Sequence, residues 1–148
     1  MFLTKNNWDD VDSTCDKFSL NGKKVEGKVV SVYDGDTVNL VFPLHDKLYK
    51  WNCRLSGIDT PELRTKCKLE KEFGYKVRDY LREQIEGKVI DVDCHDFDKY
   101  GRLLTTLRIK KEDPKTINQL LIDRGYAFEY DGGKKKSWSE YLKESHKQ

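Results

Sequence analysis

The chain has 148 residues, a length that predicts one domain built around a single hydrophobic core. Hydrophobic and charged residues each make up 36% of the chain and aromatic residues 11%, which excludes a wholly disordered protein. The formal net charge of +2 excludes a protein that binds nucleic acid through its overall charge, so any site for a polyanion depends on local placement of basic residues.

No stretch of the sequence is long and apolar enough to cross a membrane, and residues 1–20 lack the apolar segment of a secretion signal. The 4 cysteines form no CxxC pair and the 3 histidines are scattered, a pattern that argues against a structural zinc site. We expect a monomer without membrane contact, in an intracellular or virus-encoded setting.

The N-terminal segment differs from the rest of the chain in its hydrophobic pattern. Residues 1–22 show no clean hydrophobic period and are interpreted as an N-terminal extension, and residues 23–148 as the folded domain. The domain opens with three β-branched or aromatic runs separated by turn residues. These runs predict a meander of strands over residues 25–32, 38–42 and 48–55.

Alternation along the third run predicts where its side chains point. Tyr49, Trp51, Cys53 and Leu55 are expected on one face of the strand, because side chains two residues apart share a face. Arg54 is then expected on the opposite, polar face.

The hydrophobic period changes after the third strand. Apolar residues recur every three to four positions and predict a helix over residues 69–85, ended by Gly87. Four further elements follow: strands over residues 89–94 and 103–109, a helix over residues 117–124, and a short last helix over residues 137–144. This order predicts an α+β protein with a five-stranded OB-fold barrel and about three helices, one of which bridges the third and fourth strands.

Three short segments carry charged residues at turns or strand ends: Tyr-Asp-Gly-Asp-Thr at residues 33–37, Arg-Leu-Ser-Gly-Ile-Asp-Thr-Pro-Glu at residues 54–62, and Asp-Lys-Tyr-Gly-Arg at residues 98–102. Each alone has a structural interpretation. The first and third are polar hairpin turns, and Thr60 with Pro61 is a plausible helix entrance.

Together and in this order, the three segments resemble the signature of the staphylococcal nuclease-like (thermonuclease) family. The resemblance covers residues 25–130 and includes Asn118 and Gly125 in the second predicted helix. It implies that the carboxylates of Asp36 and Asp59 and the backbone carbonyl of Thr60 hold one Ca²⁺. Such hard oxygen ligands suit Ca²⁺ and disfavour zinc. Asp34 is expected near this metal.

The resemblance also assigns the residues that act on phosphate. Arg54 and Arg102 correspond to the two phosphate-binding arginines, and a guanidinium donates paired hydrogen bonds to the oxygens that gain charge during attack. Glu62 corresponds to the carboxylate that acts as general base or positions the attacking water. The implied reaction is hydrolysis of DNA and RNA to products with 3′-phosphate ends.

Further contacts to the nucleic acid are implied for three residues. Lys99 and Tyr100 correspond to residues that contact a terminal phosphate, and Tyr130 to a tyrosine that stacks on or flanks the nucleotide. Residues 134–136 are consecutive lysines that either contact a longer substrate or form a solvated charge run. The alternative function is a catalytically inert module of the same fold that binds nucleic acid or protein.

Overall fold

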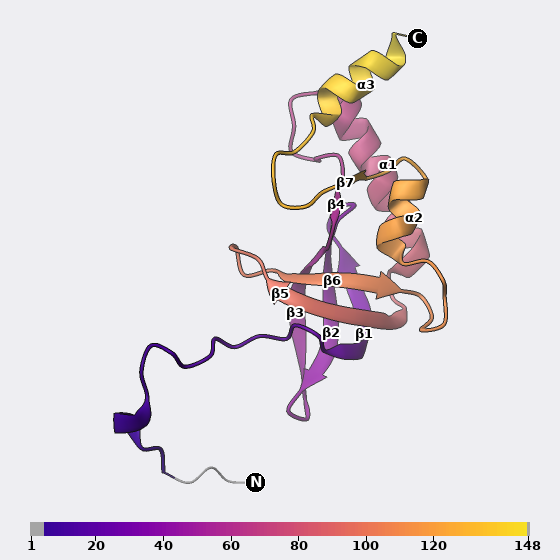
Figure 1. Cartoon of the computed structure of the whole chain (residues 1–148). Helices are drawn as coiled ribbons and strands as arrows, with labels where there is room; N and C mark the ends of the chain where they lie inside the picture. The colour runs from indigo at the N-terminus through magenta and orange to yellow at the C-terminus, as the bar shows by residue number, and fades with distance from the viewer. Residues whose placement is uncertain (1–4, 148) are drawn as a thin grey trace.

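A closed barrel of five strands, in the order β1-β2-β3-β6-β5, forms the centre of the molecule in the computed structural model, which describes residues 5–147 (Figure 1). Its strands are β1 (Lys24–Val32), β2 (Thr37–Leu44), β3 (Lys47–Leu55), β5 (Val89–Phe97) and β6 (Leu103–Arg108). Neighbouring strands are antiparallel except β3 and β6, which run parallel. The predicted α+β fold with a five-stranded barrel is confirmed.

Helices and a small second sheet lie at one end of the barrel (Figure 1). They are α1 (Lys68–Ile85), α2 (Ile117–Asp123), α3 (Trp138–His146) and the paired short strands β4 (Ile58–Asp59) and β7 (Phe128–Glu129). α1 bridges the third and fourth long strands as predicted, and packs against both β1 and α3. β4 and β7 were not predicted, because two-residue strands show no measurable period.

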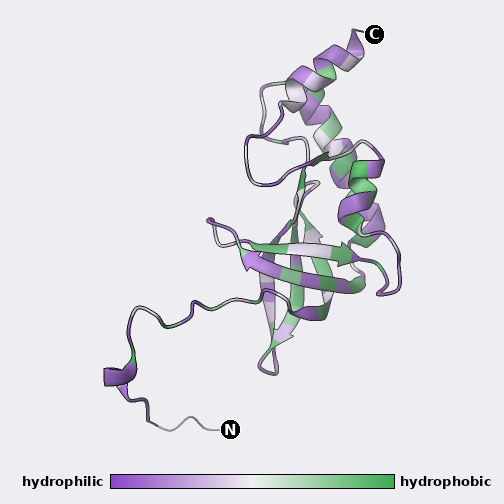
Figure 2. Cartoon of the chain, viewed as in Figure 1, coloured by the Kyte–Doolittle hydropathy of each residue, from purple (hydrophilic) through white to green (hydrophobic). Residues whose placement is uncertain are grey.

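The barrel closes because its strands bury every second side chain. In β2 these are Val38, Leu40 and Phe42, each at most 1% exposed. α1 adds an apolar stripe that includes Val77 and Leu81 and packs on the same core. Figure 2 shows these apolar positions along the barrel strands and on the inner faces of the helices.

The N-terminal segment runs from the barrel away from α3 and is mostly hydrophilic (Figures 1 and 2). Residues 5–19 are exposed and include a short 3₁₀ helix, η1 (Trp8–Asp10). From residue 5 onward, the first buried side chain is Leu20, just before β1. The boundary between extension and domain stays a prediction. Among residues 5–147, no helix combines the length and apolar character needed to cross a bilayer.

The structure agrees with the alternation predicted for the third strand, but burial along it is uneven. Cys53 and Leu55 face the core, and Tyr49 lies on the same face with its ring 6.2 Å from that of Trp51, although Tyr49 is 42% exposed. Trp51 is half-buried and stacks on Phe42. Arg54 was expected on a polar face and is only 7% exposed, because the acidic turn and Tyr130 pack around its guanidinium.

Candidate active site

The predicted site residues of the first two segments meet where the β1–β2 turn faces the end of β3 and β4. The Arg54 guanidinium lies 3.5 Å from Asp36 Oδ2 and donates a 2.9 Å hydrogen bond from Nη2 to the carbonyl of Ile58. The Thr60 N–H donates to the same Asp36 oxygen at 3.3 Å. The two segments are thus bonded to each other, a convergence that sequence spacing alone does not provide.

Three aspartates form a buried acidic cluster at this junction. Asp34, Asp36 and Asp59 are 8%, 8% and 4% exposed. Burial, the nearby charge of Asp36 and a hydrogen bond between the two side chains raise the pKa of Asp34 to about 7, although the Asp36 N–H that donates to Asp34 opposes this shift. Burial also raises the pKa of Asp59, and the charge of Asp36 adds to this, although Lys135 opposes it. Crowded carboxylates of this kind favour a bound cation.

Two basic side chains of the protein face the acidic cluster. Arg54 is nearly buried beside Asp36. Lys135 comes from the loop between β7 and α3, and its ammonium lies 3.4 Å from Asp59 Oδ1 and 4.0 Å from Glu62 Oε1. The cluster is therefore partly neutralised by the chain itself.

Glu62 is exposed at the edge of the cluster, on a loop that is held by α1. Although the Glu62 side chain is 56% exposed, partial desolvation of its carboxyl, followed by the charge of Asp36, raises the pKa of Glu62. The Glu62 N–H donates a 2.8 Å hydrogen bond to Glu70 Oε2, and Glu70 Oε1 accepts from the Thr65 hydroxyl. The buried Glu70 carboxylate thus fixes the backbone that carries Glu62.

Gly35 lets the acidic turn approach α1 closely. A Cβ at this position would lie 2.6 Å from Val77 Cγ1 and 2.8 Å from Thr60 Oγ1. No side chain fits there without moving the turn or its neighbours. Glycine at this position therefore sets how close Asp36 lies to Thr60.

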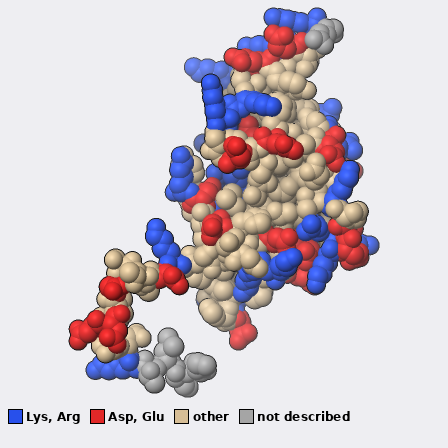
Figure 3. Space-filling view, viewed as in Figure 1, with Lys and Arg blue, Asp and Glu red and all other residues tan. Residues whose placement is uncertain are grey.

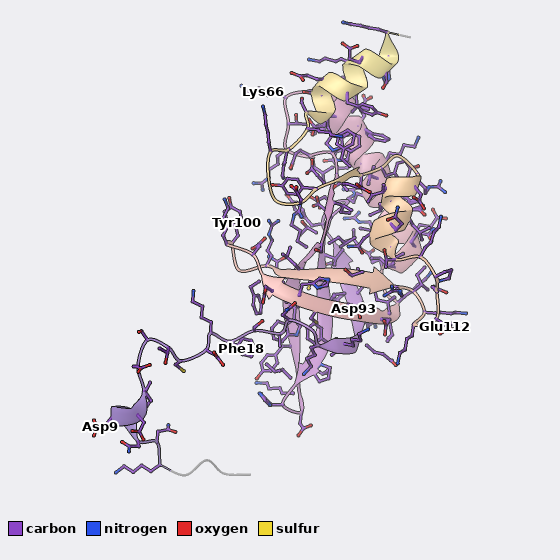
Figure 4. All side chains as sticks on the ribbon, viewed as in Figure 1. Asp9, Phe18, Lys66, Asp93, Tyr100 and Glu112 are labelled. Carbon is purple, nitrogen blue, oxygen red and sulfur yellow. The ribbon has the colours of Figure 1, made fainter. Side chains whose placement is uncertain are left out.

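The third predicted segment joins the site through a groove with a volume of about 590 Å³. We call it the arginine groove and define it by these lining residues: Arg54, Lys99, Tyr100, Arg102, Tyr130 and Lys135. Arg102 is held in place by Asp98, which accepts a 2.8 Å hydrogen bond from Arg102 Nε and another from the Arg102 N–H. Tyr100 projects from the β5–β6 turn toward the loop before α3 (Figure 4).

Tyr130 is the aromatic residue that faces the groove after β7. Its ring lies 5.6 Å from the Arg54 guanidinium, and its N–H donates to the carbonyl of Gly57. Phe128, two residues earlier, instead stacks on Trp138 with ring centroids 3.9 Å apart. Phe128 therefore anchors α3, and Tyr130 is the ring available to a ligand in the arginine groove.

Asn118 supports the site from α2. Its side-chain amide donates hydrogen bonds to the carbonyls of Ser56 and Thr105, and its carbonyl accepts from the Leu107 N–H. These bonds tie the turn after Arg54 to β6. The match of Asn118 to the family pattern thus has a structural reason in this chain.

Sequence reasoning missed three supporting residues: Glu70, Asp98 as the partner of Arg102, and Lys135 as a neighbour of the acids. Glu70 stands three residues after the helix N-cap Cys67, the position of a capping-box acid, and that was its only signal. Lys135 was visible only as part of a basic run.

The predicted metal ligands are oxygen atoms, which suit a hard cation. Asp36 and Asp59 place carboxylate oxygens beside the backbone of Thr60. Because these carboxylates are buried and repel each other, a bound cation would be favourable here. Among the described residues, no group of three or more His, Cys, Asp or Glu is arranged to hold a metal. A cation here would complete its shell with water and substrate oxygens.

A sequence model described as "Staphylococcal nuclease homologue" matches residues 52–148 of the chain. The chain belongs to this family. The matched part contains Arg54, Asp59, Glu62 and Arg102, and it begins after the turn that carries Asp36. Family membership predicted from the three segments is confirmed.

Relatives in three groups of organisms resemble most of the chain. An uncharacterized protein of Methanocaldococcus jannaschii is 34% identical over 125 residues, covering 70% of this chain and 58% of that protein. An "Uncharacterized endonuclease" of Escherichia coli O157:H7 is 29% identical over 107 residues, covering 72% and 62%. A "Probable endonuclease LCL3" of Candida dubliniensis is 26% identical over 131 residues, covering 76% and 56%. The chain spans less than two thirds of each of these proteins.

Proposed function

We propose that this chain is a Ca²⁺-dependent nuclease that hydrolyses phosphodiester bonds of DNA and RNA. The observation that carries the proposal is the arginine groove, in which Arg54 and Arg102 from separate elements face one cavity next to the buried acids. A phosphodiester is the substrate class that needs both positive donors and a cation-binding acid cluster. The family and the two relatives named endonuclease support the same activity.

The arginines bind and stabilise the reacting phosphate in this proposal. Each guanidinium donates hydrogen bonds to the non-bridging oxygens, which gain negative charge as water attacks phosphorus. Arg54 is held by Ile58 and Asp36, and Arg102 by Asp98, so both are positioned before substrate binds. Such preorganisation is the main source of electrostatic catalysis.

Glu62 is proposed to accept the proton of the attacking water. Its raised pKa makes its carboxylate a stronger base than an ordinary glutamate, and Glu70 fixes the loop that carries it. The water oxygen bonds to phosphorus as its proton passes to Glu62, the bond to the 5′ oxygen breaks, and that oxygen takes a proton from solvent as it leaves. The products then carry a 3′-phosphate and a 5′-hydroxyl.

Asp36, Asp59 and the carbonyl of Thr60 are proposed to hold the Ca²⁺. When bound, the ion supplies positive charge beside the phosphate and polarises water. Lys99 and Tyr100 would contact a neighbouring phosphate at the groove rim, and Tyr130 would stack on a base. Stacking tolerates every base, which suits a substrate range that includes DNA and RNA.

The test is digestion of single-stranded DNA by the purified chain with Ca²⁺ or with a chelator, beside an Arg54→Ala/Arg102→Ala double variant. Cleavage that needs Ca²⁺ and is lost in the double variant is the expected result, and end-group analysis of the products tests for 3′-phosphates. A folded chain that binds DNA without cutting it would instead be an inert binding module. A chain that neither binds nor cuts DNA would contradict both the nuclease and an inert module that binds nucleic acid.

A further inference from the structure

A second basic groove lies between α1 and the β1–β2 region, outside the arginine groove. It has a volume of about 620 Å³, and we call it the α1 groove after its charged and aromatic lining residues: Tyr33, Arg64, Lys71, Tyr75, Arg78 and Arg82. No Asp or Glu lines it. Elsewhere basic and acidic side chains are mixed over the face seen in Figure 3. The α1 groove is lined by four cations, of which Arg78 and Arg82 pair with Asp79 and Glu86 outside the lining.

Part of this positive charge has a structural role. Arg82 donates a 3.0 Å hydrogen bond to the carbonyl of Val32, and Arg78 bonds Asp79 and lies over the ring of Tyr75. Arg64 and Lys71 differ, since their side chains make no hydrogen bond or ion pair with any residue of the described range 5–147. Two free cations beside two tyrosines thus remain available to a ligand.

The position of the α1 groove points to its ligand. Tyr33 directly precedes the acidic turn, and Leu63 to Thr65 directly follow Glu62, so both walls continue from the loops that carry the acids. The arginine groove contacts the same acids through two of its lining residues, because Arg54 pairs with Asp36 and Lys135 pairs with Asp59. The acidic cluster therefore adjoins both basic grooves, the arginine groove through the Arg54–Asp36 pair and the α1 groove through residues next to the acids in sequence. A polymer bound at the cluster can reach either groove.

We infer that the α1 groove binds the phosphate backbone of the same nucleic-acid strand, on the side of the cleaved bond opposite the arginine groove. The inference rests on the proposed nuclease function. Phosphates pair with Arg64 and Lys71, and bases pack against Tyr33 and Tyr75, which are 51% and 38% exposed. Cations interleaved with aromatic rings are the chemistry that single-stranded nucleic acid selects.

The test uses an Arg64→Gln/Lys71→Gln double variant and two single-stranded DNA oligonucleotides of about 4 and about 16 nucleotides, the limits of the site sizes of OB folds. Fluorescence anisotropy with a chelator present measures binding without cleavage. A Lys110→Gln/Lys111→Gln variant removes the same charge from the exposed loop after β6 and serves as the matched control. Thermal unfolding of all variants checks that the fold is retained.

We expect the Arg64→Gln/Lys71→Gln variant to bind the longer oligonucleotide about tenfold more weakly at about 0.1 M salt, with a salt slope reduced by about 1.4, because two phosphate contacts are lost. Its binding and Ca²⁺-dependent cleavage of the short oligonucleotide should match wild type. Unchanged affinity and salt slope for the longer oligonucleotide would overturn the α1 groove as a binding site, while cleavage of the short one would leave the nuclease function standing. A wild-type chain that neither binds nor cuts either length would overturn both.

Discussion

The Lys135 ammonium lies 3.4 Å from Asp59 Oδ1, so a side chain of the protein supplies positive charge where the proposed Ca²⁺ would bind. Lys135 also lies 4.0 Å from Glu62, and its ammonium is 5.5 Å from the ring of Tyr130. The loop before α3 therefore contacts the proposed metal ligand Asp59, the proposed general base Glu62 and the proposed stacking ring of Tyr130 at once. Ca²⁺ binding and the position of this loop are expected to be coupled.

Replacing Lys135 should strengthen Ca²⁺ binding. The Lys135→Gln change removes a charge that repels the ion and competes for Asp59. Two charges about 4 Å apart in water interact by about 1 kcal/mol, so the affinity should rise by about fivefold or more at this partly buried pair. Isothermal titration calorimetry of Ca²⁺ without substrate measures it. Lys134→Gln is the matched control, because the neighbouring Lys134 forms no ion pair with Asp59 or Glu62, whereas Lys135 pairs with both. Equal or weaker affinity in Lys135→Gln would contradict the competition.

Lysine should not replace the groove arginines. Arg102→Lys keeps the charge but loses the paired donors to phosphate, and turnover should fall about a hundredfold while the fold is retained. The same result is expected for Arg54→Lys. Arg108→Lys is the control, because Arg108 also pairs with an aspartate, Asp93, at similar exposure on the barrel wall. Near wild-type rates in either groove variant would argue against a phosphate-binding role.

The order of elements could be predicted because each long strand and α1 show a clear period. The three charged segments could also be predicted, because their residues lie in turns with recognisable sequences. The convergence of these segments in space could not be predicted. It depends on closure of the barrel by the parallel β3–β6 pair and on the β4–β7 pair, which has only two residues per strand.

The burial of the site residues could not be predicted from the sequence pattern either. Alternation placed Arg54 opposite Leu55, which is correct for a strand, but it did not reveal that Asp36 and Tyr130 cover that face. Lys135 and Glu70 come from elements that carry no family motif. Their roles follow from contacts across 76 and 8 residues of sequence, from position 135 to 59 and from 70 to 62.

Glu62→Gln should lower the cleavage rate by roughly two to four orders of magnitude, because an amide cannot accept the proton of the attacking water. In wild type, kcat should rise with pH as Glu62 ionises, and its raised pKa moves this rise above the range of an ordinary glutamate. Glu129→Gln makes the same charge change on β7, outside the arginine groove, and should keep the wild-type rate. A loss below about threefold in Glu62→Gln would remove Glu62 from the proton transfer.

Gly35→Ala should weaken both stability and Ca²⁺ binding. The new methyl group would lie 2.6 Å from Val77 Cγ1, and relieving this overlap should cost about 1–3 kcal/mol of unfolding free energy. Movement of the turn would also displace Asp36 from Thr60. Gly27→Ala is the control, because a methyl group on that strand meets its neighbours at 3.4 Å. Urea unfolding and calorimetry measure the two effects, and equal behaviour of the variants would refute the close fit at Gly35.

Asp98→Asn should change how stability depends on pH. Burial acts to raise the pKa of Asp98, but hydrogen bonds from the Arg102 and Tyr100 N–H groups and the charge of Arg102 outweigh it and lower the pKa below the ordinary value of 3.8. The folded state then binds this proton less tightly than the unfolded state. The stabilisation from Asp98 is present above that ordinary value and is lost as the pH falls through the lowered one.

Urea unfolding from pH 7 down to pH 2 tests this. The free energy of unfolding of wild type should fall more steeply with acid than that of Asp98→Asn, whose amide does not titrate. Asp131→Asn is a suitable comparison, since Asp131 lines the same groove without pairing with Arg102. Because Asp98 also orients Arg102, Asp98→Asn should reduce turnover at neutral pH by less than Arg102→Lys does. Parallel acid unfolding of wild type and Asp98→Asn would show that this pair contributes nothing to the folded state.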